Sequence, residues 1–176
     1  MFMKKWNQNL IRSKATLKTS LVSKLKENAC KCMPKFHEIQ NILIPKKKVV
    51  TVYHVEDHSH FYSIDGSIVL FENDEGKIFP FLKVAIEYPN LIRSVCTSIA
   101  AMLSIKKGAN LMIRGAWCVD ETYEKNEIVK VCLEKQKIPY AIGYMAVSGP
   151  EVLQAGDGPA VIIVHILKDG LWEAQI

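Results

Sequence analysis

The sequence lacks any long, uninterrupted apolar segment. Its longest uncharged apolar stretch, residues 160–167, contains His165, whereas a membrane-spanning helix needs roughly 18 apolar residues. This stretch is therefore expected to form a buried strand. Lys4 and Lys5 follow the N-terminus without a subsequent apolar run, so no secretory signal is expected. These absences predict a cytoplasmic protein that makes no use of a membrane.

The sequence also lacks a cysteine pattern typical of disulfide frameworks or zinc sites. The five cysteines form no CxxC pair and no framework spacing, so free thiols in a reducing cytosol are the simplest interpretation. No Ser, His and Asp set and no convincing pair of carboxylates is found, and therefore no catalysis is expected. Without repeats or low-complexity segments, the 176 residues suit one large domain or two small ones.

Acidic residues are rare in the first part of the chain. Residues 1–50 contain 12 Lys and Arg against only Glu27 and Glu38, whereas residues 51–176 contain 11 against 16 acidic residues. Clustered cations concentrate phosphates electrostatically. The N-terminal third is therefore expected to meet a polyanion or an acidic partner.

Hydrophobic periodicity divides the chain near residue 91. In the first part it predicts helices at 16–32 and 36–45, strands at 49–54, 60–64 and 67–72, and a short helix at 82–88. The Asp65-Gly66 pair predicts a two-residue hairpin turn. In the second part it predicts a helix at 97–105, strands at 110–114, 127–133, 140–147 and 161–167, and one helical turn at 151–154. Short strands with two small helices indicate a small decorated barrel.

Several strings give these two parts a family resemblance. The second part resembles a PUA domain, an RNA-binding module, through residues 108–115 (GANLMIRG), 141–148 (AIGYMAVS) and 168–173 (KDGLWE). The first resembles the domain that precedes it in the malignant T-cell-amplified-sequence family of translation factors. The matching residues there are the Met-Phe start, 17–20 (LKTS), 44–47 (IPKK), the Asp65-Gly66 hairpin and 79–82 (FPFL).

This resemblance implies an α+β fold, with an N-terminal pre-PUA α/β domain at residues 1–91 and a PUA β-pseudo-barrel at 92–176. It also implies a non-catalytic RNA-binding factor on the small ribosomal subunit, contacting its rRNA and possibly tRNA. There it would recycle tRNA and subunit after termination and support reinitiation or unconventional initiation. The implied partner is a density-regulated-protein-like subunit, which would hold the zinc of such a heterodimer, so this chain is expected to need no cofactor. The alternative is an RNA-modification enzyme, or its accessory subunit, that uses the PUA domain to bind tRNA or rRNA.

Two positions depart from the usual PUA pattern. Val95 is followed by residues 96–100 (CTSIA), without the acid and the glycine that usually open the first helix. The close backbone approach that this glycine would allow is therefore not expected here. Arg114 replaces the usual proline before Gly115 and places a guanidinium, which binds phosphate or stacks on a base, beside the expected RNA face.

A lysine run is the first candidate site. Lys46, Lys47 and Lys48 lie between a predicted helix and a predicted strand. Such a run is often a solvated connection, but here it adds to the surplus of Lys18, Lys24 and Lys31, which favours a phosphate clamp on rRNA.

The second candidate site lies in the PUA part. Lys106 and Lys107 end the predicted first helix, where cations also suit the helix dipole without any ligand. This helix and the following strand line the usual PUA face, so both lysines and Arg114 are candidate RNA contacts. Trp117, in an expected loop, is a candidate for base stacking.

A dense polar group could imitate a metal site. It comprises His54, Glu56, Asp57, His58 and His60. Successive strand side chains point to opposite faces, whereas zinc needs three or four converging ligands. The group is therefore interpreted as the polar tip of a hairpin, and no metal is expected.

Overall fold

The computed structural model describes residues 10–134, 138–170 and 172. They form two compact units that divide between Leu91 and Ile92. Both units combine helices with a sheet, which confirms the predicted α+β fold. No helix in this described part is both long and apolar enough to cross a bilayer.

The N-terminal unit is built on a five-stranded antiparallel sheet, with its strands in chain order. The strands are β1 (Ile11–Thr16), β2 (Val50–Val55), β3 (His60–Ile64), β4 (Ser67–Glu72) and β5 (Ile78–Pro80). Strands β3, β4 and β5 consist mainly of β-branched and aromatic residues, most of which are buried. The Phe71 and Phe79 rings stack with centroids 5.1 Å apart, and both are fully buried.

The Asp65-Gly66 turn between β3 and β4 is confirmed. Asp65 has φ 51° and Gly66 has φ 79°, the pair of positive values that a type I′ turn requires. The β2–β3 connection places His54 directly opposite His60. The polar group around these histidines is therefore a hairpin tip, as expected.

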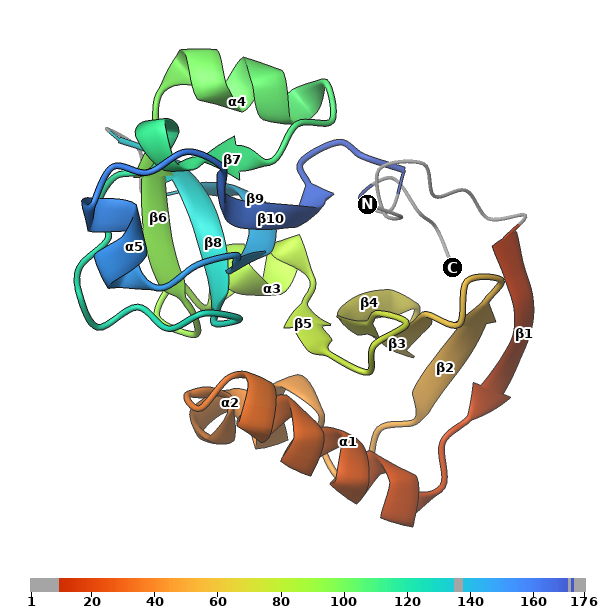
Figure 1. Ribbon diagram of the computed structural model, residues 1–176. Coiled ribbons are helices and arrows are strands. Elements are labelled where there is room, and N and C mark those ends of the chain that lie inside the picture. Colours follow the sequence, from red (N-terminus) through yellow and green to blue (C-terminus); the bar gives the residue numbers. More distant parts are fainter. Residues whose placement is uncertain (1–9, 135–137, 171, 173–176) are drawn as a thin grey trace. The chain divides into compact units, whose positions relative to one another are not determined.

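Two helices lie along one face of this sheet (Figure 1). They are α1 (Thr19–Cys32) and α2 (Phe36–Leu43), close to the predicted ranges, and α3 (Leu82–Glu87) follows the sheet. Helix α1 buries Leu25 and Ala29, whereas the apolar residues nearer its start stay more exposed.

The C-terminal unit contains a curled five-stranded sheet in the order β6-β8-β9-β10-β7. Its strands are β6 (Arg93–Thr97), β7 (Leu111–Met112), β8 (Ile128–Leu133), β9 (Pro139–Met145) and β10 (Pro159–Ile166). Strands β6 and β8 are parallel, and the other neighbours are antiparallel. The stretch at 160–167 is a mostly buried strand, as predicted.

Four details of the sequence prediction were wrong. Strands β1, β5 and β6 were not predicted, and the expected strand at 110–114 ends at Met112. Beyond Met112 the chain tightens into a 3-10 turn, Ile113–Gly115, in which the Ala116 N–H donates to the Ile113 carbonyl at 3.1 Å. Arg114 therefore lies on a turn and not on a strand.

Helices α4 (Ile99–Lys106) and α5 (Gly149–Leu153) complete this unit. The Ser98 Oγ caps α4 by accepting from the Ala101 N–H at 3.2 Å. In the segment that departs from the usual PUA pattern, Cys96 and Thr97 thus end β6, and Ser98 forms a regular N-cap of α4.

Candidate RNA-binding surfaces

The lysine run lines a groove in the N-terminal unit, which we call the lysine groove. Helices α1 and α2 and the segment from Pro45 to Val50 surround about 890 Å³. Lys26, Lys46, Lys47 and Lys48 line it, and Glu27 is the only acidic residue among the described residues that line it. Glu27 already pairs with Lys31 at 2.7 Å. The groove therefore presents a clear excess of positive charge.

The predicted clamp residues are all exposed at this groove. They lie on a turn between α2 and β2 that leaves their side chains exposed. In this turn the Lys48 N–H donates to the Pro45 carbonyl at 3.0 Å. Lys48 Nζ lies 2.9 Å from Asp65 Oδ2, and both side chains are more than half exposed. Exposed pairs of this kind contribute about 0–1 kcal/mol, so a phosphate can compete for Lys48.

Lys26 is a groove residue that sequence reasoning missed. Its ammonium donates to Asn41 Oδ1 at 3.0 Å. Partial burial, followed by the nearby charge of Lys46, lowers the pKa of Lys26 below its usual value. A bound anion would offset this repulsion. In the sequence Lys26 resembles Lys18, Lys24 and Lys31, and only the packing of α2 beside α1 distinguishes it.

The other lysines of the N-terminal surplus do not line this groove. Lys18 and Lys24 line a different groove against the sheet, while Lys31 forms the ion pair with Glu27. The sequence analysis treated these basic residues as one group, but in the structure they lie at different sites.

In the C-terminal unit, the predicted contacts lie on α4 and the segment that follows it. Lys106 is in the last turn of α4, Lys107 is its C-cap, and both are exposed. Arg114 Nη2 forms an ion pair with Asp157 Oδ1 at 2.8 Å, and both side chains are highly exposed. A Cβ added at Gly115 would lie 3.6 Å from Ala101 Cβ. The turn that carries Arg114 therefore packs against α4.

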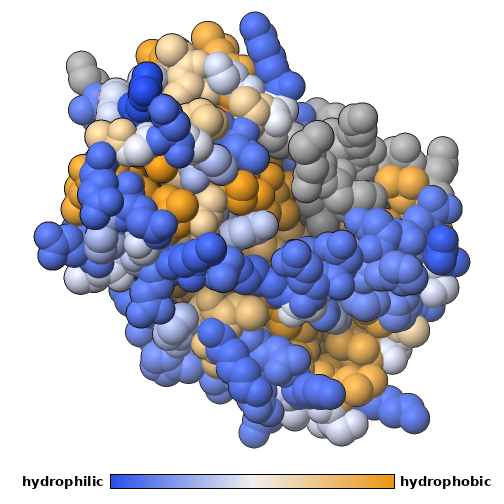
Figure 2. Space-filling view, in the orientation of Figure 1, coloured by the Kyte–Doolittle hydropathy of each residue, from blue (hydrophilic) through white to orange (hydrophobic). Residues whose placement is uncertain are grey.

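Apolar side chains accompany these cations. Ile99, Leu103, Met112 and Trp117 are between 40% and 64% exposed. Figure 2 shows apolar residues at the top of the view, where Figure 1 places α4. The surface thus combines a few cations with apolar groups, a mixture that suits unpaired bases beside phosphates.

Trp117 is held by its backbone. Its N–H donates to the Cys96 carbonyl at 2.8 Å, and the Cys96 N–H donates to the Trp117 carbonyl at 2.9 Å. These bonds fix the segment to β6 and leave the indole 40% exposed.

Arg93 anchors the loop that follows Trp117, a role that sequence reasoning did not identify. Its guanidinium carbon lies 3.4 Å from the centre of the Tyr123 ring. It donates to Asp120 Oδ1 at 3.1 Å and to Thr122 Oγ1 at 2.9 Å. Hydrogen bonds from Thr122, and then Arg93, hold the pKa of Asp120 below its usual value.

The histidine-rich hairpin tip has no arrangement typical of a metal centre. The His54 and His60 rings meet edge to face at 4.8 Å, and Asp57 accepts from the Ser59 N–H at 3.1 Å. Among the described residues, no group of three or more His, Cys, Asp or Glu side chains could hold a metal ion.

The fold and sequence together define a pre-PUA domain followed by a PUA domain. Residues 6–89 match the family model of the Pre-PUA-like domain, and residues 92–170 match that of the eIF2D PUA domain. A solved hypothetical protein from the archaeon Pyrococcus horikoshii shares the fold, with a TM-score of 0.76 at 23% identity over 93% of this chain and 100% of that chain. A solved PUA-domain protein from Aeropyrum pernix gives 0.72 at 23% identity, over 92% of this chain and 89% of that one.

Curated relatives extend this similarity along almost the whole chain. Translation machinery-associated protein 20 of Schizosaccharomyces pombe is 29% identical over 177 residues, 98% of each chain. Malignant T-cell-amplified sequence 1 of Danio rerio is 25% identical over 178 residues, 99% of this chain and 98% of its own. The chain belongs to the family that these proteins represent, as its sequence motifs indicated.

Proposed function

We propose that the protein is a non-catalytic, RNA-binding translation factor that acts on the small ribosomal subunit in the cytoplasm. The observation that carries this proposal is the similarity of both domains, over nearly the full length, to proteins named for their association with the translation machinery. A PUA domain supplies the RNA-binding module.

The lysine groove supports rRNA as the target of the first domain. RNA phosphates carry one charge per nucleotide, and each phosphate that a lysine neutralises releases counterions. Lys46 and Lys47 form no ion pair with any residue between 10 and 172 that the structure describes, so binding breaks no internal bridge there. The first domain would therefore supply affinity without reading sequence.

The PUA surface supports contact of a different kind. Lys106, Lys107 and Arg114 offer charges for phosphates, and Trp117 offers an exposed ring on which a base can stack. An unpaired end or loop of rRNA, or the end of a tRNA, has the unstacked bases that such a surface can hold.

The family resemblance further suggests the cellular role. We propose that the protein works as a heterodimer with a density-regulated-protein-like subunit. The pair would release tRNA and recycle the small subunit after termination, and would support reinitiation or unconventional initiation.

Binding to purified ribosomal subunits tests this proposal. Fluorescently labelled protein is titrated with small and with large subunits over a range of salt concentrations. We expect preferential binding to the small subunit that weakens steeply with salt. Absence of binding to small subunits, with and without the partner subunit, would reject the proposed function.

A further inference from the structure

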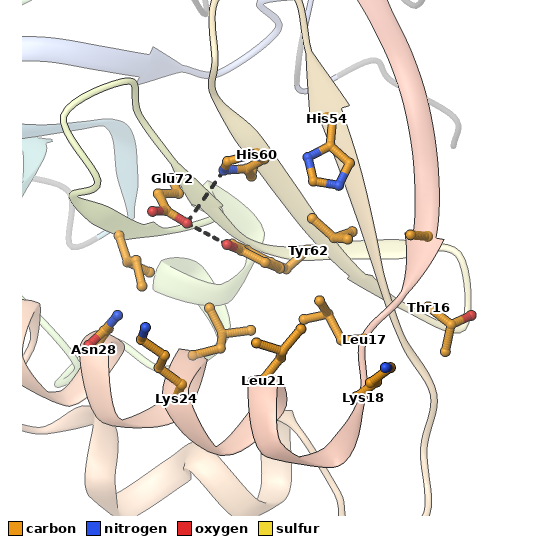
Figure 3. Close-up of a pocket in the computed structure, with 14 residues that line it drawn as sticks. Thr16, Leu17, Lys18, Leu21, Lys24, Asn28, His54, His60, Tyr62 and Glu72 are labelled. Carbon is orange, nitrogen blue, oxygen red and sulfur yellow. Dashed lines mark hydrogen bonds and ion pairs between the residues drawn. The ribbon is translucent and has the colours of Figure 1, made fainter.

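The N-terminal unit contains a second groove that RNA binding does not explain, which we call the helix–sheet groove. It lies between α1 and the face of the β1–β5 sheet (Figure 3) and encloses about 460 Å³. That volume lies within the range of about 300–1,000 Å³ typical of ligand sites. It shares only Thr16 and Leu17 with the lysine groove.

One end of this groove is aliphatic. Leu17, just before α1, and Leu21, in its first turn, line it together with the buried side chains of Leu25, Val52 and Ile78. Leu21 is 48% exposed, although it continues the apolar stripe that Leu25 buries one turn later. The stripe of α1 is therefore covered by the sheet only in its later turns, and its start is left open.

The other end of the groove is polar. The Tyr62 hydroxyl donates to Glu72 Oε2, and His60 Nδ1 lies 3.6 Å from the same oxygen. Burial, together with Glu72, raises the pKa of Tyr62 far above its usual value, so this hydroxyl stays a donor. A carboxylate accepts about four hydrogen bonds, so Glu72 retains capacity for a further donor.

Lys24 on the helix wall faces this polar end, whereas Lys18 lies at the aliphatic end beside Leu17 (Figure 3). In Figure 3 the side chains of Lys24 and Asn28 rise from α1 toward Tyr62 and Glu72. Within the described ranges, Lys18 and Lys24 form no ion pair. Glu72 is the only acidic residue that lines the groove in the part of the chain that the structure describes, and Tyr62 and His60 already contact it. The helix side of the groove therefore carries positive charge that an acidic ligand can neutralise.

The lining favours aliphatic side chains over nucleic-acid bases. A base needs an open ring face on which to stack. Here His54 and His60 meet edge to face, and Tyr62 is 8% exposed. Leu17 and Leu21, by contrast, are the flexible, branched contacts that receive the apolar side chains of a peptide.

We propose that the helix–sheet groove docks a short segment of a partner protein in which aliphatic residues alternate with acidic ones. Its aliphatic side chains cover Leu17 and Leu21, its carboxylates pair with Lys18 and Lys24, and a peptide N–H donates to Glu72. The inference goes beyond RNA binding, because it gives the basic domain a protein-docking site separate from the lysine groove.

Selection from a random peptide library tests this inference. A phage-displayed library of random 12-residue peptides is selected on the immobilised full chain, and an enriched peptide is synthesised for fluorescence anisotropy. The test variants are Leu21→Glu and Lys24→Glu. The matched controls are Ile42→Glu, which changes an exposed aliphatic residue on α2, and Lys35→Glu, neither of which lines the groove. Unchanged thermal unfolding confirms that each variant is folded.

We expect enriched peptides that combine Leu, Ile or Val with Asp or Glu. Both test variants should weaken their binding at least 10-fold, and both controls should leave it unchanged. The combined change of Lys46, Lys47 and Lys48 to Ala should also leave it unchanged, which separates this inference from the RNA proposal. The inference is overturned if no peptide is enriched, if binding survives Leu21→Glu, or if an RNA oligonucleotide occupies the groove instead.

Discussion

Replacement of Lys46, Lys47 and Lys48 together by Ala should reduce affinity for small ribosomal subunits by a calculable amount. Each lysine that contacts a phosphate contributes about 0.7–0.9 to the slope of log K against log salt. The loss of three such contacts reduces the magnitude of this slope by roughly 2–3, which corresponds to about 50- to 150-fold weaker binding near 0.15 M salt. Lys48 should contribute least, because its ammonium must first leave Asp65, 2.9 Å away.

The triple variant should remain folded. The only ion pair that it removes among the described residues is the exposed one to Asp65, worth about 0–1 kcal/mol. Urea unfolding should therefore give nearly the wild-type free energy, and a loss of RNA binding can be assigned to the groove.

A matched variant controls for net charge. Lys14, Lys35 and Lys125 are exposed and line neither groove, so their combined replacement by Ala removes the same charge elsewhere. Fluorescence anisotropy at several salt concentrations gives both slopes. Equal slopes for the two triple variants would refute the lysine groove as a phosphate clamp and leave only a general effect of charge.

Three further predictions concern the PUA domain. Trp117→Ala should weaken subunit binding by about 1–2 kcal/mol without changing the salt slope, because it removes stacking and no charge; an altered slope in the same titration would contradict this role. Arg93→Ala should lower the free energy of unfolding in urea by about 1–2 kcal/mol, because it removes the ring contact and hydrogen bonds that anchor the loop; an unchanged midpoint would show that the loop is held otherwise. Exposed Cys118 should react quickly with Ellman's reagent near pH 8. Cys96 should stay unreactive, because burial, and to a smaller extent the neighbouring Cys118, raises the pKa of its thiol to about 12. Cys118→Ser should abolish the fast phase of the reaction, and persistence of that phase would disprove the assignment.

The elements that the sequence predicted are those with a strong local signal. The helix stripe through Leu25 and Ala29 and the Asp65-Gly66 turn each depend on a few neighbouring residues, and both appear where expected. Strand β1 was missed because five of its six residues are exposed, so it lacks apolar alternation. Its pairing with β2 is a long-range event that only the tertiary fold supplies.

The same distinction applies to the candidate sites. A run such as Lys46 to Lys48 is visible in the sequence, and its lysines share a groove because they are neighbours in the chain. Lys26 joins them only through the packing of α1 beside α2, and Glu72 meets Tyr62 only through the sheet. The helix–sheet groove was therefore beyond sequence reasoning, because no local pattern connects its two walls.

Crosslinking to RNA tests the central claim most directly. The full chain is bound to purified small ribosomal subunits and irradiated with ultraviolet light, and nucleotide-modified peptides are identified by mass spectrometry. The account predicts adducts on the peptides that contain Lys46 to Lys48 and Trp117, and their loss when free small subunits compete. Adducts confined to other peptides, or no adducts despite binding, would contradict it.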